Sequence, residues 1–256
     1  MGSVSGQRVW VTGASSGIGE ALVAPLVARG ARVAITARRR DLLDAIAARH
    51  NGATGSPVIA IPADVTDRDA IHAAARHIEH AWGGIDVAIF NAGGSVGLEG
   101  GAFHADDYTQ TMTLNYFSVV YGIDAVLPGM LERGKGHIAA VASLGGYRPT
   151  PVAVAYGASK AAVIHLMDGL RFDLAPRGVA ITVINPGFVR TPLTARHTFH
   201  MPFLVEAADA AERIVRGLEH HAREIHFPAP LSWTMKALRV LPYGLYAQII
   251  KRATPR

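Results

Sequence analysis

Residues 9–19 read VWVTGASSGIG and join a short apolar run to a helical pattern. The continuous apolar run 9–11 is typical of a buried strand. The glycines after it would let the backbone approach a bound pyrophosphate, and a helix that starts there offers free N–H groups and a partial positive charge. The spacing Gly-x-x-x-Gly-x-Gly differs from the general dinucleotide pattern Gly-x-Gly-x-x-Gly, so an ordinary glycine-rich turn stays open as the alternative.

Similar runs of valine and isoleucine recur along the chain, separated by enough residues for a helix. This alternation predicts an α/β fold, a single doubly wound Rossmann domain with a parallel sheet of about seven strands and helices on both faces. The predicted strands are 9–11, 33–35, 58–61, 87–90, 138–141, 181–184 and 224–227. The predicted helices are 18–29, with a kink at Pro25, and 41–50, 67–81, 106–131, 159–174 and 206–221. Residues 193–204 are expected to form a loop near the site.

Composition narrows the class of protein. The length of 256 residues suits one domain, 1–256, with a core at 7–227 and an apolar, basic, helical extension at 228–256. Half of the residues are hydrophobic and 18% are charged, which excludes broad disorder. The absence of cysteine excludes disulfides, thiolate catalysis and cysteine-ligated metal sites. We find no apolar run near the length of a membrane span and no secretory segment at the start, so we expect a cytoplasmic protein.

The net charge of +5 lies entirely in the last part of the chain. Residues 1–224 hold 20 basic and 20 acidic side chains, whereas residues 225–256 hold five basic residues and no acid. We therefore expect no nucleic-acid partner. The segment 231–250 is also rich in large apolar residues, which leaves three alternatives: the wall or lid of an apolar substrate pocket, a subunit contact, or a helix resting on anionic lipid. All three favour an apolar substrate over a small polar one.

The end of the second predicted strand bears on the choice of cofactor. It reads Thr-Ala-Arg-Arg-Arg over residues 36–40, and no carboxylate appears before Asp41. An acid at this point would bind the ribose of NAD, whereas a guanidinium suits the 2'-phosphate of NADP. Arg38, helped by Arg39, therefore favours NADP(H) over NAD(H), with a solvated basic turn as the alternative.

Tyr156 and Lys160 stand four residues apart at a predicted helix start, so their side chains share one face. A neighbouring ammonium, with an oxidised nicotinamide, would lower the pKa of the phenol toward the range of acid/base catalysis. Tyr156 could then protonate a carbonyl oxygen during reduction. Without further residues around it, such a pair would be an ordinary surface pair.

Further motifs accompany this pair in a fixed order. They are the turn 12–19, Asp64-Val65, Asn91-Ala92-Gly93, Asn115, Ser143 placed 13 residues before Tyr156, and Asn185-Pro186-Gly187. In this combination the sequence resembles the short-chain dehydrogenase/reductase family over about residues 7–227. The resemblance implies a catalytic tetrad of Asn115, Ser143, Tyr156 and Lys160. In it, Tyr156 is the general acid/base, Lys160 lowers its pKa, Ser143 binds the substrate oxygen and Asn115 holds a relay water.

The resemblance also implies a set of cofactor contacts and an assembly. The implied contacts are Gly13, Ser15, Ser16, Gly17, Ile18, Gly19, Arg38, Asp64, Val65, Asn91, Ala92, Gly93, Tyr156, Lys160, Pro186, Gly187, Val189 and Thr191. A homodimer or homotetramer is expected, with the helices 106–131 and 159–174 as contact surfaces. Two positions depart from the family pattern: Phe90 replaces a common asparagine, and Ser16 stands where NADP-preferring relatives often have a basic residue.

These features predict an oxidoreductase that transfers a hydride between NADP(H) and a carbonyl or secondary alcohol. A catalytically silent dinucleotide-binding sensor or scaffold is the alternative, as is dehydration or epimerisation in the same site. Histidines 197, 200, 220 and 221 lack the convergent partners of a zinc site, so we expect no metal.

Overall fold

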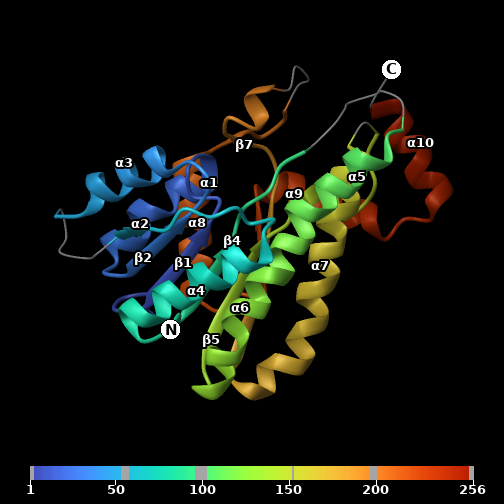
Figure 1. The fold of residues 1–256 in the computed structure, drawn as a ribbon. Helices are drawn as coiled ribbons and strands as arrows, with labels where there is room; N and C mark the ends of the chain where they lie inside the picture. Colours follow the sequence, from blue (N-terminus) through green and yellow to red (C-terminus); the bar gives the residue numbers. More distant parts are fainter. Residues whose placement is uncertain (1–2, 53–57, 96–102, 152, 197–200, 254–256) are drawn as a thin grey trace.

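The computed structural model describes residues 3–52, 58–95, 103–151, 153–196 and 201–253. Seven strands form one sheet in the order β3-β2-β1-β4-β5-β6-β9, and every neighbouring pair is parallel (Figure 1). The strands are β1 (Arg8–Thr12), β2 (Arg32–Thr36), β3 (Val58–Ala60), β4 (Val87–Phe90), β5 (Gly136–Val141), β6 (Val179–Pro186) and β9 (Glu224–Phe227). All seven predicted strands and the doubly wound fold are confirmed.

The sheet separates two apolar cores, because neighbouring residues of a strand point to opposite faces. Val9 and Val11 enter one core with helices α2 (Val23–Ala28), α3 (Arg40–His50) and α8 (Ala207–Glu219). Trp10 enters the other with helices α4 (Arg68–Trp82), α6 (Ser118–Glu132) and α7 (Val154–Leu174). Phe90 belongs to this second core, where its ring meets that of Trp10 edge-on at 6.0 Å between centroids. The two layers of helices are visible in Figure 1.

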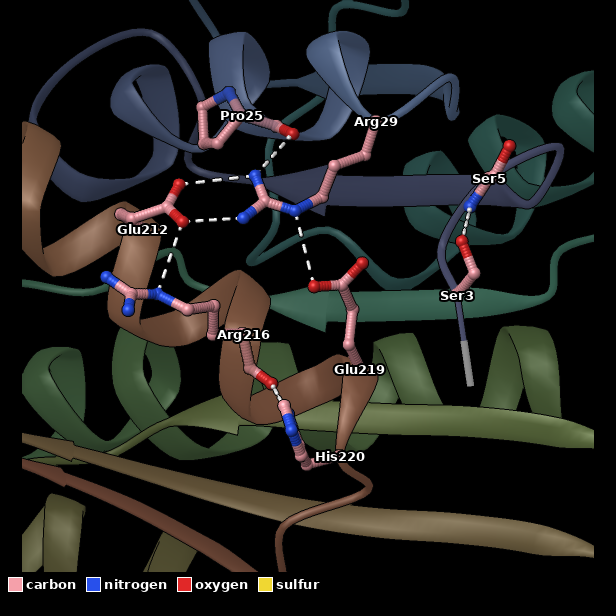
Figure 2. A network of polar contacts seen from close by, with 8 residues as sticks. All are labelled: Ser3, Ser5, Pro25, Arg29, Glu212, Arg216, Glu219 and His220. Carbon is pink, nitrogen blue, oxygen red and sulfur yellow. Dashed lines mark hydrogen bonds and ion pairs between the residues drawn. The ribbon is translucent and has the colours of Figure 1, made fainter. Parts of the chain in front are cut away.

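The first predicted helix is interrupted, as expected for Pro25. It consists of α1 (Gly17–Ala21) and α2, with a break at Leu22, because proline has no N–H to bond to the preceding turn. Arg29 at the end of α2 donates to the carbonyl of Pro25 at 3.1 Å and to both carboxylate oxygens of Glu212 on α8 (Figure 2). Glu219 of α8 adds a third carboxylate contact at 3.3 Å. This network fixes the helix that follows the glycine turn against α8.

The helix predicted at 106–131 has a more complex course. It consists of α5 (Ala105–Met112), one π-helical turn η1 (Thr113–Phe117) and α6. By length and composition alone, the stretch Ala105–Glu132 would qualify as a membrane span. Its buried apolar residues, among them Val119, Ile123 and Met130, pack against the sheet. Within this fold the stretch therefore covers one face of the sheet.

The remaining elements are short or lie near the C-terminus. Helix α7 begins at Val154, five residues before the predicted start, so Tyr156 lies in its first turn. Short helices are η2 (Leu144–Gly146), η3 (Ala175–Arg177) and η4 (Thr194–Arg196), and β7 (Val189–Arg190) pairs in parallel with β8 (Val205–Glu206). The extension contains two helices, α9 (Ala229–Arg239) and α10 (Tyr243–Ala253), as predicted. We call these two helices the C-terminal pair.

Candidate active site

A cavity of about 870 Å³ opens at the carboxyl ends of the strands. In doubly wound folds this edge is where ligands bind, at the point where the strand order reverses. Here that point lies between β1 and β4, which are neighbours in the sheet although β2 and β3 separate them in the chain. All the sequence-predicted site residues line the cavity except Gly19 and Asn115. The structure thus brings together residues that are up to 178 positions apart, from Gly13 to Thr191.

The backbone of the glycine turn packs closely against the residues that follow strand β4. Gly13 has φ +66°, and a Cβ there would lie 2.6 Å from the Cα of Ala92. A Cβ at Gly19 would lie 2.5 Å from the side-chain nitrogen of Asn91, although Gly19 itself does not face the cavity. The same Asn91 nitrogen donates to the carbonyls of Thr12 at 3.1 Å and Gly13 at 3.2 Å. Asn91 therefore fixes the turn by hydrogen bonds from the neighbouring strand end.

Two arginines follow strand β2 at the rim of the cavity. Arg38 is 78% exposed in its side chain, and its Nη1 lies 3.8 Å from Oδ2 of Asp64. Arg39 turns the other way and donates from Nη2 to the hydroxyl of Ser15 at 2.9 Å. Sequence reasoning gave the main role to Arg38, yet Arg39 is the arginine that reaches the glycine turn. Neighbouring arginines cannot be ranked from the sequence, because their reach depends on side-chain rotamers.

Asp64 is held as an anion in the wall of the cavity. Its Oδ1 accepts from the backbone N–H of Thr66 at 2.9 Å and from its hydroxyl at 2.7 Å. Burial alone would raise the pKa of this carboxyl, but the two hydrogen bonds and the charge of Arg38 outweigh burial and lower it. Asp64 is thereby preorganised as a hydrogen-bond acceptor at the cavity wall.

Ser143, Tyr156 and Lys160 converge in the same cavity. Lys160 is 3% exposed, and its Nζ donates to the carbonyl of Val141 at 2.7 Å. Burial lowers the pKa of its ammonium to about 8. Ser143 is held by its own local turn, because its Oγ accepts from the N–H of Gly145 at 3.0 Å. The hydroxyl of Ser143, the phenol of Tyr156 and the ammonium of Lys160 therefore lie close together in a partly buried site.

Burial raises the pKa of Tyr156 above its ordinary value in this structure, and a hydrogen bond with Ser143 only partly offsets this effect. The lowering of this pKa expected from the ammonium together with an oxidised nicotinamide stays a prediction. The ammonium of Lys160 lies 5.8 Å from the centroid of the Tyr156 ring and is directed to the Val141 carbonyl. Tyr156 is therefore poised as a neutral proton donor.

Asn115 lies behind the cavity and organises its wall. Its Oδ1 accepts from the N–H of Gly94, and its Nδ2 donates to the carbonyl of the same residue, both at 2.8 Å. Nδ2 also donates to the hydroxyl of Ser159 at 2.8 Å, and that hydroxyl donates to the carbonyl of Tyr156 at 2.7 Å. Asn115 lies in the π-helical turn η1. A Cβ at Gly93 would lie 2.9 Å from Oδ1 of Asn115 and 3.0 Å from Nζ of Lys160. Any larger residue at this position would therefore crowd both side chains.

The last part of the wall follows strand β6. The N–H of Gly187 donates to the carbonyl of Phe227 at 2.7 Å, and a Cβ at Gly187 would lie 2.8 Å from a methyl group of Leu231. Thr194 supports the wall by donating from its hydroxyl to the carbonyl of Val189 at 2.7 Å. Within the described part of the chain, no residue beyond 227 lines the cavity. The extension contacts Gly187 through Leu231. Of the three roles considered for residues 231–250, the wall of the substrate pocket thus applies only through this contact.

Several lining residues were missed in the sequence. Thr109, Gln110, Thr113 and Leu114 face the cavity from α5 and η1. Their only sequence signal is position, because helix residues shortly before Asn115 had to lie near it. They give this end of the cavity both apolar and hydrogen-bonding groups.

No group of three or more metal-ligating side chains is found in the residues that the structure describes. His197 and His200 lie outside those residues. His220 donates from its Nδ1 to the backbone carbonyl of Arg216 at 2.7 Å (Figure 2). The absence of a metal therefore stays a prediction.

Comparison with known proteins decides the family. The family model described as short chain dehydrogenase matches residues 7–201. The chain belongs to this family. An uncharacterized oxidoreductase of Myxococcus xanthus is 37% identical to this short chain dehydrogenase over 254 residues, which is 98% of this chain and 99% of that protein.

Solved structures of the family share the fold. A short chain dehydrogenase from Burkholderia cenocepacia in complex with NADP has a TM-score of 0.82 at 25% identity, covering 97% of this chain and 98% of that one. A short chain dehydrogenase/reductase from Burkholderia phymatum in complex with NAD has a TM-score of 0.84 at 23% identity, covering 92% of this chain and 94% of that one. The short chain dehydrogenase described here thus has structural neighbours that bind either dinucleotide.

Proposed function

We propose that this protein is an NADP(H)-dependent reductase of a carbonyl compound, which also oxidises the corresponding secondary alcohol. The observation that carries the proposal is the convergence of Ser143, Tyr156 and Lys160 in the cavity that the glycine turn also lines. Gly13 lets the glycine turn pack directly on the residues after β4, because a Cβ there would lie 2.6 Å from the Cα of Ala92. NADPH would supply the hydride to the carbonyl carbon.

The chain's own groups handle the oxygen and the proton. The hydroxyl of Ser143 would donate a hydrogen bond to the substrate oxygen and stabilise the negative charge that develops there. Tyr156, whose pKa is raised by burial, would transfer its proton to this oxygen and become a phenolate. The ammonium of Lys160 would stabilise the phenolate until a proton from solvent restores it. Asn115 would support the relay from behind by holding Gly94 and Ser159 in place.

The NADP(H) preference rests on the basic rim of the cavity. Arg38 and Arg39 both line it, and no carboxylate follows β2 before Asp41. A 2'-phosphate would meet two guanidinium groups there, whereas the diol of NAD would lack its usual acidic acceptor. The family's structures with NAD and with NADP leave this choice to the residues of each chain.

The substrate end favours a mainly apolar carbonyl compound with one hydrogen-bonding group. Leu114 and Leu193 would contact the apolar part, and Gln110 offers both a donor and an acceptor. A homodimer or homotetramer and a cytoplasmic location remain predictions. The exposed Phe172 on α7, at 82%, supports α7 as a contact surface.

Titration with NADPH and NADH, followed by a panel of apolar ketones and aldehydes, tests the proposal. We expect tighter binding of NADPH and loss of its absorbance with at least one carbonyl. Tyr156→Phe should remove turnover and leave NADPH affinity within about twofold, because only the proton donor is lost. Tyr121→Phe, which removes a hydroxyl on α6 outside the cavity, is the matched control. Tight NADPH binding without turnover on the panel or its alcohols would favour the silent sensor instead.

A further inference from the structure

The C-terminal pair has an inner side that is fixed to the body of the protein. Leu231 and Met235 of α9 pack against the core that contains α6 and α7. Tyr246 of α10 is 3% exposed, and its hydroxyl donates to the carbonyl of Pro149. The orientation of both helices is therefore set, and their other side faces away from the core.

The outer side of the pair exposes large apolar side chains. Trp233 is 63% exposed, Val240 81%, Tyr243 70% and Leu245 49%, all within 13 residues of chain. Trp233 on α9 and Val240, which caps the end of this helix, stand seven apart with the exposed Ala237 between them, so they share one face. Burial of this much apolar surface would be favourable if a partner covered it.

Cations surround these apolar groups. Arg239, Lys251 and Arg252 are exposed, and the sequence from 225 to 256 contains no acidic residue. On α10, Leu245 and Arg252 stand seven apart with the exposed Gln248 between them, which places an apolar group and a cation on the same helix face. The rest of the chain is neutral, with 20 basic and 20 acidic side chains, so the positive charge is local to this element.

We propose that the outer side of the C-terminal pair binds the surface of an anionic lipid bilayer. Exposed tryptophan and tyrosine are suited to the head-group level, and lysine and arginine attract anionic head groups. Each helix has 11 residues, which at 1.5 Å per residue is about half of the hydrocarbon thickness, so the pair lies in the interface and does not span it. Figure 1 shows α10 at the outer edge of the molecule, on the side away from α3 in this view, where a flat surface could reach it.

A second copy of the chain fits this face less well. A two-fold symmetric contact brings the same patch together from both subunits. Here it would bring Arg239, Lys251 and Arg252 of both subunits into one contact, with no carboxylate in the extension to neutralise them. Anionic lipid satisfies both the apolar surface and the charge.

The inference is independent of the proposed activity and is tested by binding alone. The full-length protein is floated with vesicles of phosphatidylcholine, with or without phosphatidylglycerol, at low and high salt. We expect flotation with the anionic vesicles, loss of it at high salt, and a blue shift of tryptophan emission. Trp233→Phe should remove most of the shift, because the other two tryptophans, Trp10 and Trp82, pack in the core that contains α4. Neutral vesicles should bind weakly.

Matched variants separate charge from apolar contact. The double variant Lys251→Gln with Arg252→Gln should lower partitioning by on the order of tenfold, since each cation near an anionic surface contributes about 1 kcal/mol. Arg76→Gln with Arg177→Gln removes two exposed cations elsewhere and should change partitioning little. Trp233→Ser with Tyr243→Ser should also weaken binding. Circular dichroism and the Tm of every variant confirm folding.

Three results would overturn the proposal. One is no preference for anionic over neutral vesicles, and another is an equal effect of the two charge-removal variants. The third is a fall in molar mass by light scattering for Trp233→Ser with Tyr243→Ser, without vesicle binding by the unmodified chain. This last result would assign the face to a second copy.

Discussion

The guanidinium of Arg148 lies 4.6 Å from the ring centroid of Tyr246, and so joins the segment after Ser143 to helix α10. Arg148 also donates to the carbonyl of Leu241, between α9 and α10. One residue earlier, the hydroxyl of Tyr147 donates to the carboxylate of Glu224, which accepts from Lys236 of α9 at 2.7 Å as well. The C-terminal pair thus holds the segment that carries the serine of the candidate active site, although it does not line the cavity.

Arg148→Met should show this connection in both stability and turnover. The variant keeps an apolar stem but loses the cation over Tyr246 and the hydrogen bond to Leu241, which together contribute about 1–2 kcal/mol, or roughly 2–8 °C in Tm. We expect lower kcat with nearly unchanged NADPH affinity, because the Ser143 segment loosens while the dinucleotide contacts stay. Arg177→Met, at an exposed position of η3, is the control for Tm and kcat. An unchanged kcat with lower Tm would limit Arg148 to a structural role.

The sheet and the position of the site followed from the sequence for simple reasons. Continuous runs such as 87–90 can only be buried on both faces of a parallel sheet, and the carboxyl ends of such strands meet at one edge. The π-helical turn at Asn115 had no such signal, because the apolar spacing of a long helix continues through it. Contacts such as Arg148 with Tyr246 join residues 98 apart, and no local pattern encodes them. The burial of Tyr156, which raises the pKa of its phenol, likewise could not be known from residue spacing.

Arg39→Ala and Arg38→Ala should weaken NADPH much more than NADH. Removal of one charge-assisted hydrogen bond to a 2'-phosphate costs about 1.5–3 kcal/mol, or roughly 10–100-fold in Kd. Fluorescence titration of both cofactors measures the ratio. Arg40→Ala, at the exposed first residue of α3 and outside the cavity, should leave it unchanged. An equal loss for NADPH and NADH in both variants would exclude the proposed preference.

His137 should make the protein sensitive to acid. It is 4% exposed and pairs through Nε2 with the hydroxyl of Thr182 at 2.8 Å, and burial, with His221 as a lesser charge, lowers its pKa from 6.5 to about 4. Between pH 6.5 and 4 this histidine is protonated in the unfolded chain but neutral in the folded chain. The free energy of unfolding therefore falls as the pH falls, by about 3 kcal/mol at most. Denaturant unfolding from pH 7 to 4 measures it.

In His137→Gln we expect a smaller loss of stability over this pH range than in the unmodified protein. His104→Gln, at an exposed histidine, should retain the full loss and serves as the control. The same pH dependence in His137→Gln and in the unmodified protein would show that another group titrates.

Lys160 should set the alkaline limit of reduction. Its pKa is lowered by burial to about 8, so above that pH the ammonium loses its proton and no longer stabilises the Tyr156 phenolate. We expect kcat for carbonyl reduction at saturating NADPH to fall above pH 8 in the unmodified protein. Lys160→Arg, whose charge persists to a higher pH, should lose this decline at a lower overall rate, while Lys135→Arg, at an exposed position, should keep it. If the arginine variant is inactive, the pH dependence of unfolding tests the same assignment. Between pH 8 and 10.5 the unfolded lysine, with its ordinary pKa of 10.5, keeps a proton that the folded lysine has lost. The free energy of unfolding should therefore rise over this range in the unmodified protein but not in Lys160→Met. Two results would assign the titration to another group. One is a decline of kcat above pH 8 that persists in active Lys160→Arg, and the other is the same pH dependence of stability in Lys160→Met and the unmodified chain.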